Sequence, residues 1–134
     1  MKFKDLYGKE HNFALDLKYK VKSQENSKST GQYKLGQMLC MIYGRNNVLE
    51  DYPLPGCGNL SWDFWVPFAR VSFEFDGRQH FEFNKFFHGS RVGFLKQKQA
   101  DGKKQKIAEI NAIRLITLTH EVTLDELKKI IGTN

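Results

Sequence analysis

Acidic side chains in the middle of the chain are the first sign of chemistry. Asp63 lies within the aromatic run Trp62–Val66, and Glu74 and Asp76 alternate with apolar residues over 71–76. Successive side chains of a strand point to opposite faces, so Glu74 and Asp76 would point the same way, about 7 Å apart at their bases. Burying an acid in so apolar a run is costly unless it is paired or binds a cation. Three converging carboxylates therefore predict an oxygen-rich metal site for Mg²⁺ or Mn²⁺.

A histidine follows these acids closely. A glycine turn separates Asp76 from His80 in the run Asp-Gly-Arg-Gln-His. Histidine beside a metal-bound phosphodiester can act as an acid, a base or a phosphate contact at neutral pH. The structural alternative is that the acids lie on the wet face of a half-buried sheet and that His80 is a surface histidine.

Elements on both sides of these residues must position them. A capping-box spacing at Ser29–Gln32 predicts a helix that runs to about Tyr43 and stops at Gly44. Strands are expected at 46–52, 60–66, 70–75 and 112–118, with the second and third joined as a hairpin at Pro67–Ala69. Further helices are expected at 94–110 and after a second capping box at Thr123–Glu126. This order predicts an α/β sandwich, a mixed sheet flanked by helices.

The residues around the acids resemble a known family. The segments 60–67 (Leu-Ser-Trp-Asp-Phe-Trp-Val-Pro) and 73–80 (Phe-Glu-Phe-Asp-Gly-Arg-Gln-His) resemble the PD-(D/E)XK superfamily of nucleases. Within it they look like the branch of the very-short-patch-repair endonucleases and the EDxHD homing endonucleases. That branch continues with a helix carrying Gln and Asp-x-x-Lys, matched here by Gln97, Asp101 and Lys104. It then has a strand matched by Asn111–Ile116, and the resemblance covers about residues 29–120.

The resemblance implies a restriction-endonuclease-like fold and a divalent-metal-dependent endonuclease acting on DNA. Asp63 and Glu74 match the acids of its two catalytic strands, whereas Asp76 stands where the superfamily has lysine. The resemblance then leaves the positive charge or the proton to His80 or Lys104, with Gln79 in support. The bland alternative for Lys104 is a solvated, lysine-rich helix face.

A departure in the first helix leaves two interpretations open. The branch often has a metal-site glutamate there, and Gln32 stands at the matching position. Its amide oxygen would be a weaker ligand than a carboxylate. The alternative is that Gln32 only completes the capping box, in which case Gln32→Glu would cost little stability.

Basic residues flank a neutral centre. The net charge is +6, with +3 in residues 1–28, +3 in 96–134 and none between them. This distribution suits a polyanion held around an acidic site, and the loop of 81–91 interleaves bases with aromatic residues that could stack on nucleotides. A loop packed on its own sheet is the alternative. The residues expected to bind nucleic acid are Arg78, Lys85, His88, Arg91, Lys96, Lys98, Lys103 and Lys106.

Length and composition limit the remaining classes. A chain of 134 residues predicts one domain, with a basic extension over 1–28, a catalytic core over 29–120 and a C-terminal helix over 121–134. No apolar run reaches the ~20 residues of a membrane helix. The start lacks the pattern of a secretory signal, and two cysteines make no disulfide framework, which indicates a reducing, cytoplasmic location.

The function expected from all of this is metal-dependent cleavage of DNA, double-stranded in the simplest case. A homing or repair role is implied by the resemblance, and so small a domain favours a homodimer on a two-fold site. Two alternatives stay open. One is a catalytically silent nucleic-acid-binding module that keeps the nuclease fold, and the other is a protein-interaction module that uses the aromatic loop.

Overall fold

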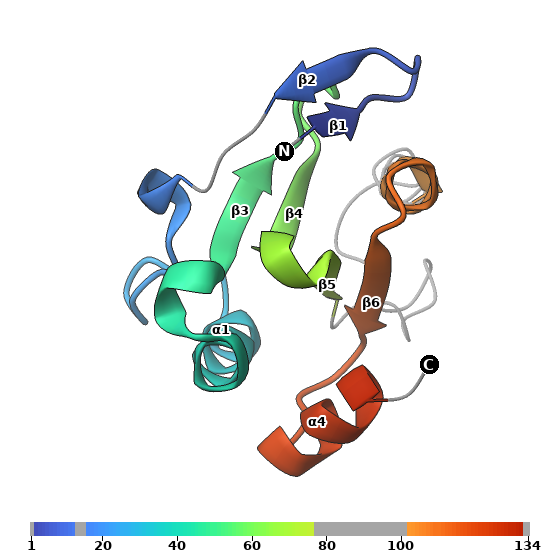
Figure 1. Cartoon of the computed structure of the whole chain (residues 1–134). Helices are drawn as coiled ribbons and strands as arrows, with labels where there is room; N and C mark the ends of the chain where they lie inside the picture. The colour runs from blue at the N-terminus through green and yellow to red at the C-terminus, as the bar shows by residue number, and fades with distance from the viewer. Residues whose placement is uncertain (1, 13–15, 77–101, 133–134) are drawn as a thin grey trace, which may run out of the picture.

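A four-stranded mixed sheet forms the centre of the computed structural model, which describes residues 2–12, 16–76 and 102–132 (Figure 1). Its strands are β3 (Leu49–Pro53), β4 (Ser61–Val66), β5 (Val71–Phe75) and β6 (Arg114–Leu118), in that order across the sheet. β3, β4 and β5 are antiparallel neighbours, and β6 runs parallel to β5. The expected mixed α/β sheet is confirmed.

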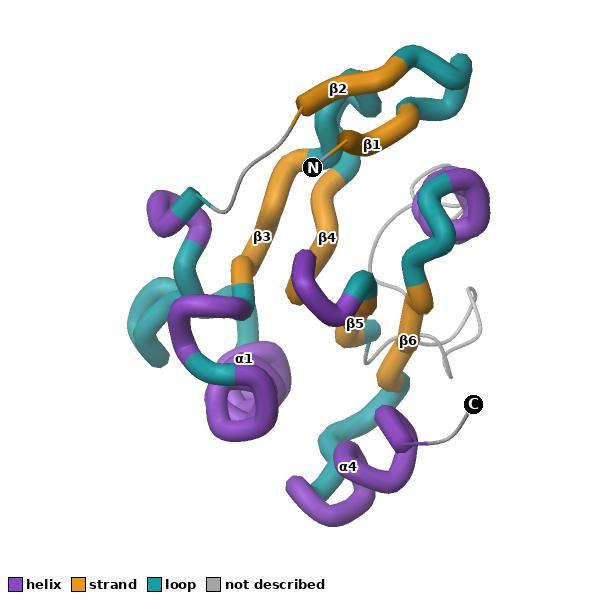
Figure 2. Tube along the Cα trace, viewed as in Figure 1, coloured by secondary structure: helices purple, strands orange, loops and turns teal. Residues whose placement is uncertain are grey.

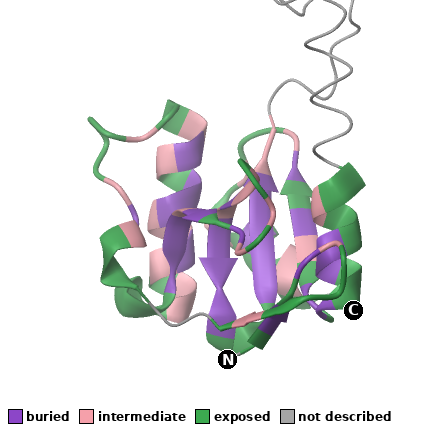
Figure 3. Cartoon of the chain, turned by 90° about the horizontal axis from the view of Figure 1, so that it is seen from above, coloured by how far each residue is buried: buried purple, intermediate pink, exposed green. Residues whose placement is uncertain are grey.

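Helices cover both faces of this sheet (Figure 2). On one face α1 (Thr30–Tyr43) and α4 (Leu124–Gly132) pack against a cluster that includes Leu39, Phe64, Phe73 and Leu127. On the other face the helix of residues 102–110 contributes Ile107 and Ala108 to a second cluster built around Trp62 and Trp65. The strands are therefore buried on both sides, as Figure 3 shows for the central ones.

This double burial decides one of the alternatives left open by the sequence. Val71 and Phe73 of β5 belong to the α1 face, as the period of two predicts. The opposite face of β5 is covered as well, because Ser72 is 0% exposed and Glu74 only 8%. The interpretation of Glu74 as a solvent-facing acid on a wet face is therefore wrong.

Helices begin at both of the predicted capping boxes. Ser29 caps α1, and its hydroxyl accepts from the Gln32 N–H at 3.1 Å. α4 begins with a reciprocal capping box, in which Thr123 N–H donates to Glu126 Oε1 at 3.0 Å and Glu126 N–H donates to Thr123 Oγ1 at 3.2 Å. α1 ends at Gly44, whose φ of 94° favours glycine.

Some predicted boundaries shift for local reasons. β3 begins at Leu49 instead of 46, because Arg45–Asn47 form a 3₁₀ turn that follows α1 directly. The Asn47 side-chain amide donates to Tyr43 O at 2.9 Å and so satisfies the end of the helix. The strand expected from 112 begins at Arg114, because Ala112 takes a left-handed φ of 54°. Of the helix expected at 94–110, only 102–110 falls within the described residues.

The N-terminal segment is folded onto the sheet, an arrangement that its polar composition did not indicate. β1 (Lys2–Lys4) and β2 (Glu10–Asn12) form an antiparallel pair, and Phe3 is buried in the second core cluster. The Asn111 side chain accepts from Lys4 N–H at 2.7 Å and donates to Lys4 O at 2.9 Å, which ties β1 to the end of the helix of residues 102–110. None of the described helices is long and apolar enough to cross a membrane.

Candidate active site

Asp63 and Glu74 face each other across neighbouring strands. The β4–β5 register pairs Phe64 with Phe73, so one further step places Asp63 opposite Glu74. At this step the backbone N–H groups donate to side-chain carboxylates instead of to carbonyl groups of the neighbouring strand. Asp63 N–H donates to Glu74 Oε2 at 2.7 Å, and Phe75 N–H donates to Asp63 Oδ2 at 3.0 Å. The two acids predicted to bind metal are therefore brought together at the point where the strands stop pairing through their backbones.

Lys104 completes this pair from a different element. It lies on the helix of residues 102–110, and its Nζ forms an ion pair with Glu74 Oε1. The contact is largely shielded from water, since the two side chains are 14% and 11% exposed. Lys104 thus brings a positive charge to the acids from outside the strand on which the superfamily pattern places its lysine.

Burial sets the electrostatics of the pair. It raises the pKa of Glu74 to about 7, with the charge of Asp63 adding to the effect and Lys104 opposing it. Burial also raises the pKa of Asp63, against the hydrogen bond from Phe75 N–H and the charge of Lys104. One lysine therefore does not fully compensate the buried Glu74 and the half-buried Asp63, and the pKa of Glu74 lies near neutral pH.

A third acid lies in the same row of the sheet. The β3–β4 register pairs Glu50 with Phe64 and Tyr52 with Trp62, which places Asp51 opposite Asp63. Asp51 has a left-handed φ of 51°, uncommon for a residue other than glycine. Its carboxylate pairs with Lys28 Nζ at 2.9 Å and with Lys22 Nζ.

Sequence reasoning missed this third acid and its lysines. The available signal was the pair Glu50-Asp51 inside the apolar run of 48–52, a run that predicted only a short strand. Adjacent acids within such a run carry the same cost that singled out Asp63.

Gln32 points inward, as expected, but toward a different acid. Its side-chain amide donates to Glu50 Oε2 at 2.9 Å, and Lys22 N–H donates to Glu50 Oε1 at 2.9 Å. Glu50 is 1% exposed, and burial raises its pKa in spite of these donors. This contact changes the stability expected for Gln32→Glu, because a second carboxylate would face Glu50.

The remaining predicted residues divide into two groups. Asp76 is half-buried directly after β5, where its N–H donates to Leu118 O at 2.8 Å, and Lys103 and Lys106 are exposed on the same helix as Lys104. The others lie outside the described residues: Arg78, Gln79, His80, Lys85, His88, Arg91, Lys96, Gln97, Lys98 and Asp101. Among the described residues, no three His, Cys, Asp or Glu side chains are grouped so as to hold a metal ion by themselves.

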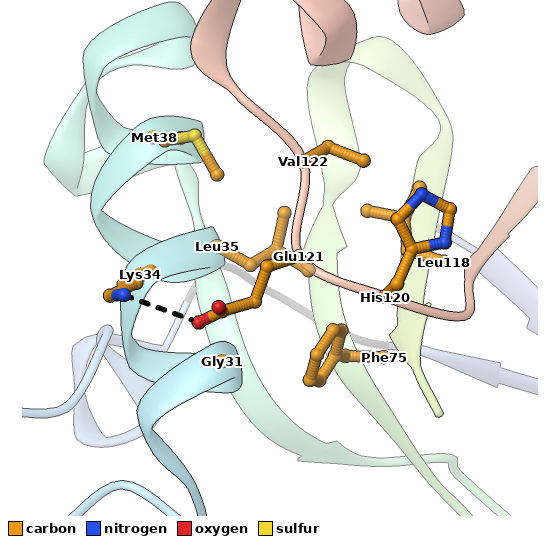
Figure 4. A pocket seen from close by; sticks show the side chains of 9 residues that line it. All are labelled: Gly31, Lys34, Leu35, Met38, Phe75, Leu118, His120, Glu121 and Val122. Atoms are coloured by element: carbon orange, nitrogen blue, oxygen red, sulfur yellow. Dashed lines mark ion pairs between the residues drawn. The ribbon is translucent and has the colours of Figure 1, made fainter. Parts of the chain in front are cut away.

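A small pocket lies between α1 and the ends of β5 and β6 (Figure 4). Leu35, Met38, Phe75 and Leu118 are among its lining residues. The ion pair between Lys34 and Glu121, at 3.3 Å, borders it. Asp63 and Glu74 do not line this pocket, so it is separate from the acid pair.

Comparison with known proteins gives relatives but no activity. The chain is 29% identical over 75 residues to the uncharacterized protein 033L of Invertebrate iridescent virus 3. It is 30% identical over 64 residues to the uncharacterized protein 307L of Invertebrate iridescent virus 6. These matches span 56% and 48% of this chain but only 38% and 32% of the relatives. No family model and no solved structure matches the chain.

Proposed function

We propose that this protein is a divalent-metal-dependent endonuclease that hydrolyses phosphodiester bonds in DNA. One observation carries the proposal. Asp63 and Glu74 lie opposite each other on adjacent strands, bind each other's strand through their carboxylates, and have Lys104 beside them. A buried acid and a half-buried acid beside one amine suit the metal-assisted hydrolysis of a phosphodiester, in which carboxylates hold the ion and a positive charge faces the phosphate.

The donor set suits Mg²⁺ or Mn²⁺. Two carboxylates held close together, with pKa values raised because their charges are incompletely compensated, would be stabilised by a divalent cation. Mg²⁺ usually keeps several waters and binds through one or two carboxylates and substrate phosphates, so a third protein ligand is not needed. Asp63 and Glu74 would hold the ion, with Asp76 as a further ligand. When bound, the ion would polarise the phosphate and acidify a water molecule.

Lys104 is the protein's own source of positive charge at the site. Its ammonium group, held by Glu74, would neutralise charge that develops on the phosphate. This arrangement supports the resemblance to PD-(D/E)XK nucleases. The strand has Asp76 where the superfamily has a lysine, and Lys104 supplies the positive charge from the helix instead. His80 as proton carrier and Gln79 as its support remain proposals from the sequence, as does Gln32, whose contact with Glu50 favours a structural role.

The substrate proposal rests on charge. The net charge of +6 and the exposed Lys103 and Lys106, on the helix that carries Lys104, would attract the DNA backbone. We further propose that the DNA is double-stranded, that the protein acts as a homodimer on a two-fold site, and that it is located in the cytoplasm.

A plasmid assay tests the function directly. Purified protein is incubated with supercoiled plasmid in Mg²⁺, Mn²⁺, Ca²⁺ or EDTA, beside Glu74→Gln and Asp63→Asn proteins purified in the same way. We expect nicked or linear plasmid only with Mg²⁺ or Mn²⁺, and none with either variant. Equal cleavage by wild type and variants would identify a contaminating nuclease and contradict the proposal.

A second candidate function is a nucleic-acid-binding module without catalysis. The observation that favours it is that Glu74 is already paired with Lys104, while the buried Glu50 accepts a hydrogen bond from Gln32 of α1. Such a module would bind DNA with a strong salt dependence and leave plasmid intact in every metal.

A further inference from the structure

Asp51, Asp63 and Glu74 form a row of acids across three neighbouring strands, here called the acid row. Two lysines from the N-terminal segment meet it at Asp51, the end opposite the one where Lys104 pairs with Glu74. Lys22 and Lys28 both pair with Asp51, which lies opposite Asp63 across the β3–β4 ladder. Asp51 and Glu74 are two strands apart, about 10 Å between their backbones.

Asp51 is built to hold these lysines. Its side chain is 15% exposed, and its left-handed φ of 51° is a conformation that strands do not otherwise need. A covered carboxylate on a strained backbone gives the two ammonium groups a fixed anchor. The lysines themselves stay accessible, with side chains 36% and 58% exposed, so a phosphate can approach them.

The charges of the acid row also act on Lys28. Burial alone would lower the pKa of Lys28, but its bond to Asp51 and the charges of Asp51, Asp63 and Glu74 together raise it. Lys28 therefore stays protonated next to the acid pair. Its ammonium group lies within the electrostatic field of the site instead of being an isolated surface charge.

We propose that Lys22 and Lys28, anchored by Asp51, bind backbone phosphates of the DNA strand that is cut at Asp63 and Glu74. Lys104 serves the phosphate at the acid pair, and these two lysines serve neighbouring phosphates of the same strand. Asp51 is a positioning residue in this arrangement. The inference rests on the proposed function and assigns a binding role to a segment that the resemblance does not cover.

The test measures the salt dependence of DNA binding. Affinity of the full chain for a DNA duplex is titrated in Ca²⁺ at three or more salt concentrations, for wild type, Lys22→Gln, Lys28→Gln, the double variant and Lys28→Arg. Lys34→Gln is the matched control, because the Lys34 side chain is also 58% exposed and also forms an ion pair, with Glu121 on another part of the surface.

We expect each glutamine variant at Lys22 and Lys28 to lower the slope of log affinity against log salt by about 0.9, and Lys28→Arg to restore it. Lys34→Gln should leave the slope unchanged. Asp51→Gly should keep its melting temperature, because glycine accepts the left-handed backbone, yet bind DNA more weakly at low salt. Slopes of the Lys22 and Lys28 variants equal to that of Lys34→Gln would overturn the inference.

Plasmid cleavage in Mg²⁺ separates this failure from failure of the function. Wild-type cleavage that persists unchanged in the double lysine variant at DNA concentrations below saturation overturns the lysine inference alone. A wild-type protein that neither binds nor cuts DNA overturns both.

Discussion

Two regions of the molecule cover acidic side chains, and the pKa of the acid is lowered in one region and raised in the other. In the N-terminal hairpin Asp5 is 4% exposed, and its Oδ1 accepts from Tyr7 N–H at 2.8 Å and Lys9 N–H at 3.0 Å. Its Oδ2 contacts His11 Nε2 at 2.8 Å. The bond to His11, with the two backbone donors, outweighs the effect of burial and lowers the pKa of Asp5.

The acid pair of the central sheet has fewer donors for more charge. Asp63 and Glu74 each accept one backbone N–H, and Lys104 pairs with Glu74 while acting on Asp63 only through its charge. The pKa of both is raised. Burial alone therefore does not fix the pKa of an acid, because the donors and charges that reach the carboxylate shift it as well.

The largest expected effect is on cleavage. Glu74→Gln and Asp63→Asn should each lower plasmid cleavage at least ~100-fold, the size of losing one strong electrostatic stabiliser, while DNA binding in Ca²⁺ persists. The matched change Asp5→Asn should lower the melting temperature and leave cleavage per folded molecule unchanged. Loss of cleavage in Asp5→Asn below its melting temperature would remove the distinction between the two regions.

The pH dependence should separate the regions next. In the metal-free protein, a Glu74 carboxyl with a pKa of about 7 is mostly protonated at pH 6 and mostly ionised at pH 8. Because the metal must displace this proton, cleavage at subsaturating Mg²⁺ should rise about tenfold over that interval. Initial rates at constant Mg²⁺ and ionic strength measure this. A flat profile from pH 6 to 8 would show that Glu74 does not control the reaction.

Stability should vary with pH in opposite directions for the two acids. The folded pKa of Glu74 lies above its ordinary 4.5, so its ionisation destabilises the fold progressively as pH rises from about 4.5 to 7. The folded pKa of Asp5 lies below 3.8, so its stabilising effect is present above that pH and is lost in acid. Melting curves of wild type, Glu74→Gln and Asp5→Asn from pH 3 to 8 should show each variant losing one of these slopes.

Substitutions of Gln32 test the environment of Glu50, the buried acid that its side chain contacts. Gln32→Glu should destabilise the fold by about 1–3 kcal/mol, because it replaces a hydrogen-bond donor with a second carboxylate. Gln32→Ala, which leaves Glu50 with one donor fewer, should cost about 1 kcal/mol. Thermal melts measure both. If Gln32→Glu is as stable as wild type and tightens Mg²⁺ binding, Gln32 belongs to the metal site.

The smallest effect concerns exposed lysines. Lys103→Gln and Lys106→Gln should each reduce the salt slope of DNA affinity by about 0.9 without changing cleavage at saturating DNA. Titrations at several salt concentrations decide it. Unchanged slopes in both variants would mean that this helix face only solubilises the protein.

Local patterns carried most of what the sequence could predict. Ser29 and Thr123 cap helices through contacts within three residues, and the 61–75 hairpin follows from alternation and a proline turn. Asp63 and Glu74 were found because an acid in an apolar strand has few stable explanations. Each of these signals lies within a short window of the chain.

The remainder depended on contacts across long stretches of sequence. The hydrogen bonds of Gln32 with Glu50 and of Lys104 with Glu74 join residues 18 and 30 positions apart, which no local pattern specifies. β1 and β2 have three residues each, too few for a period to emerge. The left-handed backbone of Asp51 was not predicted, although Asp is one of the residue types that adopt this conformation more often.

The hydrogen bonds between the Asn111 side chain and β1 have a consequence for the order in which the chain folds. It joins Lys4 to a side chain 107 positions later, and it also binds Ile107 O at 2.8 Å. During synthesis the first strand must wait until more than a hundred residues have followed it, because its docking partner does not yet exist. The second core cluster, which contains Phe3, therefore closes late on the ribosome, and apolar surface on the Trp62 side of the sheet stays open until then.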